Sequence, residues 1–205
     1  MINKEKKKLI LFPPKTGSTS FESCFKQPLY GYDFIGKTPM RSSAHMYIGE
    51  AIDFYEIEDI ENYKIYQTAR DPMNRVPSAF MHQKTMATKR GKLMKDINFE
   101  DFVKNLVENN DLLPMRKLSA RTKGSRLYLP QTTWADPEKY EVQYLKVEKD
   151  NSEIYAEMGL PEDFKIPHKN RGNFRNSNYE HLHTNKTREI IRFLYEDDFI
   201  KLNYK

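Results

Sequence analysis

The segment PPKTGSTSF, residues 13–21, brings together one lysine, one glycine and four hydroxyl side chains. It follows a short apolar run and precedes a stretch with helical character. Backbone N–H groups at the start of a helix, together with the helix dipole, favour a phosphate or sulfate oxyanion. Lys15 precedes Gly17, so the segment differs from the Walker A loop, in which the lysine follows the glycines. An ordinary strand-to-helix turn with serine or threonine capping is the alternative interpretation of this segment alone.

A second polar segment, RDPMNRVPSAF at residues 70–80, also follows an apolar run. Arg70 offers a planar fork of N–H donors, and Ser78 adds a hydroxyl one to two helical turns later, a combination that suits a phosphate monoester. Arg75 either contacts the same phosphate or braces the turn. The alternative is that Arg70 and Asp71 pair with each other or cap the next helix.

The elements around these segments place them at one edge of a sheet. KLILF (8–12), KIYQTA (64–69) and VQYLKV (142–147) are predicted strands, and helices are expected at 19–27 and 76–86. Strands that alternate with helices indicate an α/β fold with a mainly parallel sheet. The carboxyl ends of parallel strands share an edge, where ligands bind. The two polar segments are therefore expected to be neighbours, which suits one ligand with two anionic groups.

The rest of the chain is predicted to form a single domain over residues 1–205, with no internal repeat. The initial KEKKK is expected to be a solvated tail. Residues 110–140, which lack a clear period, are predicted to be an irregular insertion. Other expectations are a weak strand at 32–36, helices at 46–57, 99–109, 152–159 and 186–202, and a polar loop at 165–180.

PKTGSTSF followed by RDPMNRVPSAF resembles the two signatures of sulfotransferases that use 3′-phosphoadenosine 5′-phosphosulfate (PAPS). The first resembles that family's 5′-phosphosulfate loop, and the second its 3′-phosphate motif RDPxxRxxSxY/F, with Phe80 at the aromatic position. LKVEKD (145–150), PHKNRGNF (167–174) and the terminal helix are weaker likenesses to carbohydrate, heparan-type enzymes. The resemblance implies a P-loop-NTPase-like three-layer fold. It also implies transfer of a sulfuryl group from PAPS to an acceptor hydroxyl, most simply on a glycan.

The resemblance assigns roles to the two polar segments, 13–21 and 70–80, and to the residues between them. His45, in SAHMY, is the expected general base, because a near-neutral imidazole can accept the hydroxyl proton. Glu50 is the alternative base, since other branches of the family use a carboxylate. Lys15 is expected to stabilise charge on the departing phosphate. The expected contacts to the 5′ phosphosulfate are Lys15, Thr16, Gly17, Ser18, Thr19 and Ser20, and those to the 3′ phosphate are Arg70 and Ser78.

Two later segments are candidates for closing the site. Arg171 and Asn173, in RGNFR, are expected to contact the nucleotide, or else to lie in an exposed basic loop. In the irregular segment, Arg116 and Arg121 suit an anionic acceptor. Gln131 and Trp134 suit a sugar through hydrogen bonding and stacking; the alternative for the tryptophan is an anchor to the core.

Composition limits the remaining function classes. The formal net charge is +5, the sequence pI is about 9.0 and the mean hydropathy is −0.82. With one cysteine, no signal-peptide-like run and no apolar stretch long enough to span a membrane, the sequence suggests a soluble, cytoplasmic protein. The resemblance, without the membrane anchor of the Golgi enzymes, implies a bacterial or viral version of the family. No metal is expected. A small-molecule kinase on a similar scaffold and a basic nucleic-acid-binding domain are the alternatives, and the second is supported chiefly by net charge.

Overall fold

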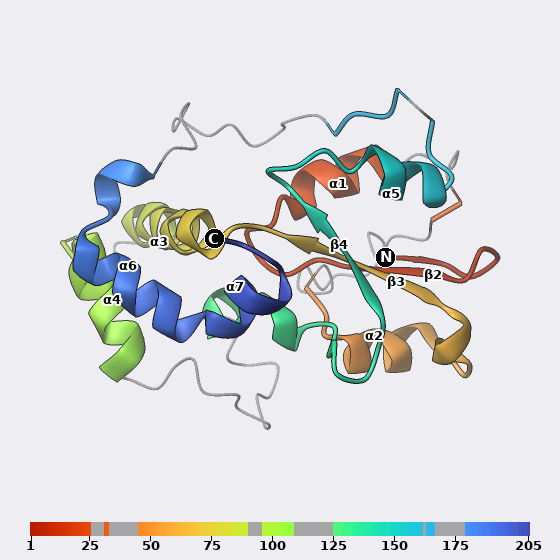
Figure 1. Cartoon of the computed structure of the whole chain (residues 1–205), viewed down its shortest axis with the longest axis horizontal. Helices are drawn as coiled ribbons and strands as arrows, with labels where there is room; N and C mark the ends of the chain where they lie inside the picture. The colour runs from red at the N-terminus through yellow and green to blue at the C-terminus, as the bar shows by residue number, and fades with distance from the viewer. Residues whose placement is uncertain (26–30, 33–44, 90–95, 109–124, 162, 167–178) are drawn as a thin grey trace. The chain divides into compact units, whose positions relative to one another are not determined.

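A computed structural model describes residues 1–25, 31–32, 45–89, 96–108, 125–161, 163–166 and 179–205 (Figure 1). Within these ranges the fold is α/β, with one four-stranded sheet and seven α-helices. The chain divides into two compact units. The first contains Met1–Arg70 and Gln131–Asn173, and the second contains Asp71–Pro130 and Phe174–Lys205. The expectation of a single domain over residues 1–205 stays a prediction.

The sheet lies in the first unit and has the order β1-β2-β3-β4. Its strands are β1 (Ile2–Asn3), β2 (Lys8–Leu11), β3 (Lys64–Ala69) and β4 (Val142–Lys146). β2 pairs with β3, and β3 with β4, in parallel, with Leu11 opposite Gln67 and Ala69 opposite Lys146. The three strands predicted from apolar runs are confirmed. The sheet is mixed because β1 is antiparallel to β2.

The prediction of a solvated tail at the N-terminal lysines is wrong, because they form the turn of a hairpin. Ile2 pairs with Leu9 and Asn3 with Lys8. The Asn3 side-chain oxygen closes the turn by accepting from the Lys6 N–H at 2.8 Å. Ile2 is fully buried. Burial of this apolar residue stabilises the pairing of β1 with β2. The charged residues that follow Ile2 gave no indication of this strand.

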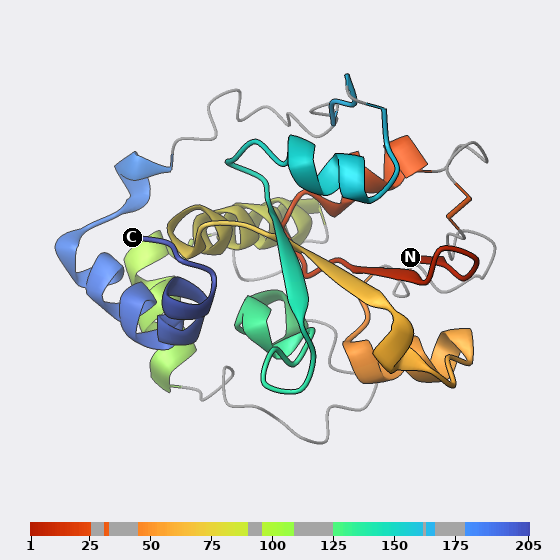
Figure 2. The ribbon, with the colours of Figure 1, turned by 45° about the vertical axis from the view of Figure 1, so that its right-hand side comes forward.

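Helices cover both faces of the sheet in the first unit (Figures 1 and 2). α1 (Ser18–Phe25) and α5 (Ser152–Glu157) cover one face, and α2 (Ile48–Tyr55) covers the other. Alternate strand residues point to opposite faces. The side of α1 and α5 buries Ile10, Phe12, Phe21, Tyr66, Leu145, Tyr155 and Met158. The side of α2 buries Leu9, Leu11, Ile48, Ala51, Tyr55 and Ile65. The first unit therefore has three layers.

The second unit is helical in its described part. It contains α3 (Pro72–Lys89), α4 (Phe99–Glu108), α6 (Asn185–Leu194) and α7 (Glu196–Lys201). The helix predicted at 99–109 is confirmed, and α3 begins four residues before its predicted start. Asp71 caps α3 by accepting from the Met73 N–H at 2.9 Å, and proline suits the first helical position. The buried core is mainly aromatic and includes Phe80, Phe99, Phe102, Tyr128, Tyr195 and Phe199.

The prediction of one terminal helix over 186–202 is wrong, because the helix breaks at Tyr195. This residue has φ −119° and ψ 28°, outside the helical range, and it separates α6 from α7. Its side chain is fully buried, and its hydroxyl donates to the Tyr128 carbonyl at 2.6 Å. A buried hydroxyl needs a partner, and that tertiary bond favours the break over one continuous helix.

The insertion predicted at 110–140 contains two short 3₁₀ turns in its described part, η4 (Ser125–Tyr128) and η5 (Gln131–Thr133). Most of the predicted strand at 32–36 and loop at 165–180 lies outside the described residues. Among the helices that the structure describes, none is long and apolar enough to cross a membrane.

Candidate anion-binding site

The loops that follow β2 and β3 meet in the first unit. Arg70, directly after β3, donates from Nη1 to the main-chain carbonyl of Lys15 at 3.5 Å. Lys15 belongs to the loop that follows β2. The sequence prediction that these two polar segments are neighbours is therefore confirmed for Lys15 and Arg70.

Lys15 is a half-buried cation beside a second cation. Burial, and then the charge of Arg70, lower the pKa of the Lys15 amine from 10.5 to about 8. Among the described residues, no carboxylate lies within ion-pair distance of its Nζ. Burying a positive charge without a counter-ion is unfavourable. A bound anion would remove that penalty, so the surroundings of Lys15 favour an anionic ligand.

The start of α1 adds backbone donors to the same loop. The Gly17 carbonyl accepts from the N–H groups of Ser20 and Phe21, at 2.9 and 3.3 Å, which begins the helix. The N–H groups of Ser18 and Thr19 belong to the first helical turn, whose donors have no carbonyl partner within the helix. Such donors and the positive end of the helix dipole favour an oxyanion.

Gly17 is required here for two reasons. Its φ is +78°, and a Cβ atom at this position would lie 3.2 Å from Cγ1 of Val147. We expect Gly17→Ala to lower the free energy of unfolding by about 1–3 kcal/mol, because both strain and crowding oppose the side chain. Chemical denaturation measures this change.

Gly49→Ala is the matched control, because Gly49 lies in α2 and a Cβ there meets nothing within 4 Å. This control is expected to stabilise the protein by about 0.5–1 kcal/mol. A neutral effect of Gly17→Ala would contradict the conformation described for the loop.

Thr16 holds the loop in place through its hydroxyl. The side chain is fully buried, and Oγ1 donates to the Pro13 carbonyl at 2.6 Å. Its single hydroxyl proton is then used, so Thr68 of β3 is the donor in the 2.6 Å bond between the two threonine hydroxyls. The Thr16 hydroxyl therefore has no proton to donate to a phosphosulfate, and the expected contact of Thr16 through its main chain stays a prediction. The hydroxyl ties the loop to the sheet, a role that the sequence alone did not reveal.

The loop after β4 brings a carboxylate to the same edge. Glu148 Oε1 lies 3.9 Å from Arg70 Nε, and the side chains are 32% and 16% exposed. Asn151 fixes this loop, because its amide accepts from the Lys146 N–H and donates to the carbonyls of Lys146 and Lys149. Glu148 is a site residue that the sequence analysis did not single out. Its signal was its place in LKVEKD, which follows a predicted strand and is one of the weaker family likenesses.

His45 is attached to the end of β2. Its Nδ1 lies 2.8 Å from the Phe12 carbonyl, and a carbonyl can only accept, so Nδ1 carries the proton. In this tautomer of the neutral ring, Nε2 holds the lone pair that can take up a proton. The side chain is half-buried. This geometry is compatible with the expected base.

Glu50, the alternative base, has a structural role in α2. Its Oε2 accepts from the main-chain N–H of Tyr47 at 3.0 Å, which caps the helix. A carboxylate that stabilises a helix start is less suited to proton transfer than His45.

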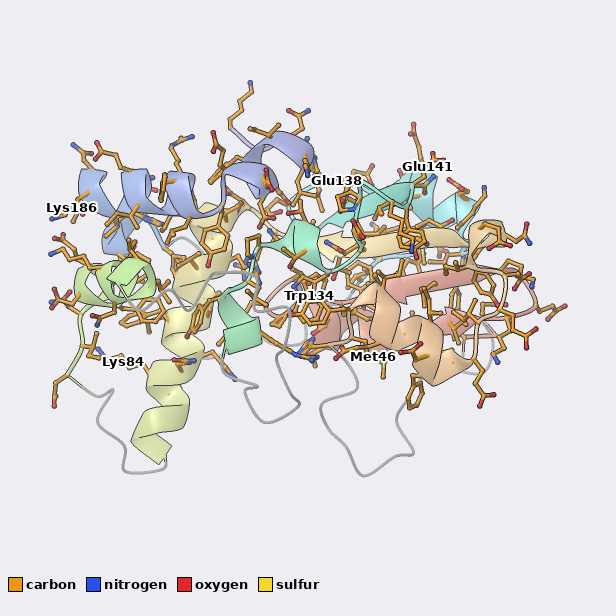
Figure 3. All side chains as sticks on the ribbon, turned by 90° about the horizontal axis from the view of Figure 1, so that it is seen from below. Met46, Lys84, Trp134, Glu138, Glu141 and Lys186 are labelled. Carbon is orange, nitrogen blue, oxygen red and sulfur yellow. The ribbon has the colours of Figure 1, made fainter. Side chains whose placement is uncertain are left out.

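The prediction that Gln131 and Trp134 contact a sugar is wrong, because both side chains are fully buried. Trp134 stacks on Tyr47 with ring centroids 4.4 Å apart, and it makes a T-shaped contact with His45 with ring centroids 6.5 Å apart. Its carbonyl accepts from the Ile48 N–H at 2.8 Å. In Figure 3 the tryptophan lies beside the start of α2, marked by Met46. The core-anchor interpretation of Trp134 is confirmed, and the anchored segment carries His45.

The 3′-phosphate motif is divided between the two units. Ser78 lies on α3 of the second unit and is 8% exposed. Its contact with a 3′ phosphate stays a prediction. Arg75 is 1% exposed and donates to the carbonyls of Leu129 and Leu127, at 2.9 and 3.3 Å. Arg75 therefore braces a turn. Four expected ligand contacts lie outside the described residues, namely Arg116, Arg121, Arg171 and Asn173.

In the part of the chain that the structure describes, no group of three or more histidine, cysteine, aspartate or glutamate side chains is arranged to hold a metal ion. Comparison of the chain with protein-family models, with curated proteins and with solved structures gave no match.

Proposed function

We propose that this protein is a PAPS-dependent O-sulfotransferase with a hydroxyl acceptor, most simply a glycan. One observation carries the proposal. Lys15 is a half-buried cation with no carboxylate partner among the described residues, and Arg70 donates to its carbonyl. The loop also leads into the first turn of α1. Two cations and free helical N–H groups at the edge of a parallel sheet suit an anionic nucleotide.

In the proposed reaction, the acceptor oxygen forms a bond to sulfur while the bond from sulfur to the phosphate oxygen breaks. His45 Nε2 takes the hydroxyl proton. The hydrogen bond from His45 Nδ1–H to the Phe12 carbonyl holds the ring in the tautomer that this step requires. Lys15 stabilises the charge that grows on the departing phosphate. The products are a sulfate ester and adenosine 3′,5′-bisphosphate.

The alternatives have less support. A P-loop-like arrangement accords with the three layers of the first unit, but a kinase would be expected to place its lysine after the glycines and to use magnesium. A nucleic-acid-binding role draws on the net charge of +5. It does not account for a lysine that is withdrawn from solvent, because phosphate-backbone contacts are made by accessible cations.

Thermal unfolding with three ligands tests the proposal. We expect adenosine 3′,5′-bisphosphate to stabilise the protein in the presence of EDTA, because protein cations and N–H groups meet its phosphates. At 100 times the dissociation constant, the gain is about 2.7 kcal/mol. ATP with magnesium tests the kinase, and a single-stranded oligonucleotide tests the nucleic-acid-binding domain. Stabilisation by either of these without an effect of the bisphosphate would contradict the sulfotransferase assignment.

A further inference from the structure

The side-chain amide of Gln131 forms two hydrogen bonds with the main chain of Arg70. The Arg70 N–H donates to Gln131 Oε1 at 2.8 Å, and Gln131 Nε2 donates to the Arg70 carbonyl at 2.7 Å. The glutamine is fully buried. Its amide thus binds Arg70 as a neighbouring strand would, one residue beyond the end of β3.

Gln131 is itself held on both sides. Its main-chain carbonyl accepts from Gln67 Nε2 at 3.0 Å and from the Trp134 N–H at 3.1 Å. Gln67 is fully buried on β3, three residues before Arg70. The amide that binds Arg70 is therefore anchored to the same strand that Arg70 follows, which leaves the arginine main chain little freedom.

The position of this pair in the chain adds to its importance. Arg70 is the last residue of the first segment of the first unit, and Gln131 is the first residue of the next segment. The two hydrogen bonds join the points where the chain leaves and re-enters this unit. Without them, Arg70 would lie at the start of the long segment Asp71–Pro130, which belongs to the other unit, and its main chain would be less firmly held.

We infer that Gln131 is a positioning residue that fixes Arg70, and with it the second cation of the anion site. The guanidinium of Arg70 lies between the Lys15 carbonyl and Glu148, so a displacement of its main chain would move it relative to both. Charge-assisted hydrogen bonds depend strongly on such geometry. This inference rests on the proposed function only in naming the nucleotide, because the arrangement itself concerns Arg70 and Lys15.

The test uses the full chain with Gln131→Met, which removes both hydrogen bonds at similar side-chain length. Gln143→Met is the matched control, because Gln143 lies in the same unit but donates to Glu157. The ¹³C NMR titration of Lys15, followed at the Cε next to its amine, reports the position of Arg70, whose charge contributes to lowering the pKa of Lys15. We expect the Lys15 midpoint to move upward in Gln131→Met and to stay unchanged in Gln143→Met.

The Arg70→Gln background separates positioning from general damage. There, adding Gln131→Met is expected to leave the Lys15 midpoint where Arg70→Gln has placed it. A further shift, or no shift from Gln131→Met in the wild-type background, would overturn the inference. Should Gln131→Met fail to fold, hydrogen exchange in the wild-type protein tests the two hydrogen bonds between Gln131 and Arg70 instead. Slow exchange of the Gln131 side-chain protons and of the Arg70 main-chain N–H supports the two bonds, and exchange of either at the rate of a free amide contradicts them.

Calorimetry with adenosine 3′,5′-bisphosphate adds a functional readout. We expect Gln131→Met to weaken binding by about tenfold or more, and to have no further effect in the Arg70→Gln background. A wild-type protein that does not bind the bisphosphate would refute the proposed function. The NMR titration would still test Gln131, because it requires no ligand.

Discussion

Replacement of His45 by asparagine is expected to lower the rate of sulfuryl transfer by about 10²–10⁴-fold, the usual contribution of a positioned base. Asparagine can keep a donor toward the Phe12 carbonyl, 2.8 Å from Nδ1 in the wild type, but it cannot take up the acceptor proton. The affinity for adenosine 3′,5′-bisphosphate should therefore change little. Single-turnover transfer from labelled PAPS to a desulfated glycosaminoglycan measures the rate, and calorimetry measures the affinity.

Glu50→Gln is the control for this prediction. The glutamine oxygen can still accept from the Tyr47 N–H, so α2 keeps its cap while the carboxylate is lost. Transfer should remain near the wild-type rate. Loss of transfer in Glu50→Gln, with retention in His45→Asn, would make the carboxylate the base.

Lys15→Met is expected to change activity and stability in opposite directions. The amine stabilises a leaving group only while it carries charge, and its loss should slow transfer by about 10²–10³-fold. The same charge is unfavourable in the unliganded protein, because burial lowers its pKa to about 8. The free energy of unfolding at pH 7 should therefore rise, by about 1–3 kcal/mol. A variant that loses both stability and activity would make Lys15 a structural residue.

The pH dependence of stability follows from the same shift. The unfolded chain holds the Lys15 proton up to its ordinary pKa of 10.5, whereas the folded protein releases it near 8. Between these values the unfolded state binds more protons, so the contribution of Lys15 to stability rises with pH. The gap in free energy of unfolding between Lys15→Met and wild type should have its full value below pH 8 and should close as the pH approaches 10.5. Denaturant titrations across this range measure the gap.

The sequence was informative where local pattern decides structure. Apolar runs predicted β2, β3 and β4, three of the four strands that the structure describes, and Gly17 with its hydroxyl neighbours predicted the turn into α1. The rule that parallel strands share a carboxyl edge then predicted that Lys15 and Arg70 are neighbours, and the 3.5 Å hydrogen bond agrees with it.

The sequence was less informative where a side chain has a partner far along the chain. The Thr16 hydroxyl binds Thr68, and the Gln131 amide binds the main chain of Arg70, 61 residues away. A polar residue in a loop has the same local pattern whether it contacts a ligand or the protein's own backbone. Burial separates the two cases, and burial depends on the tertiary fold.

Proton uptake on nucleotide binding tests the central claim most directly, which is that Lys15 meets an anionic group of the nucleotide. At pH 8 the amine of the free protein is about half protonated, and a bound anion should restore its charge. Phosphate esters are already ionised at this pH. Calorimetry of adenosine 3′,5′-bisphosphate in buffers of different ionisation enthalpy should give an uptake of about half a proton per site in the wild type and none in Lys15→Met. Binding without uptake in the wild type, or equal uptake in both proteins, would contradict the claim.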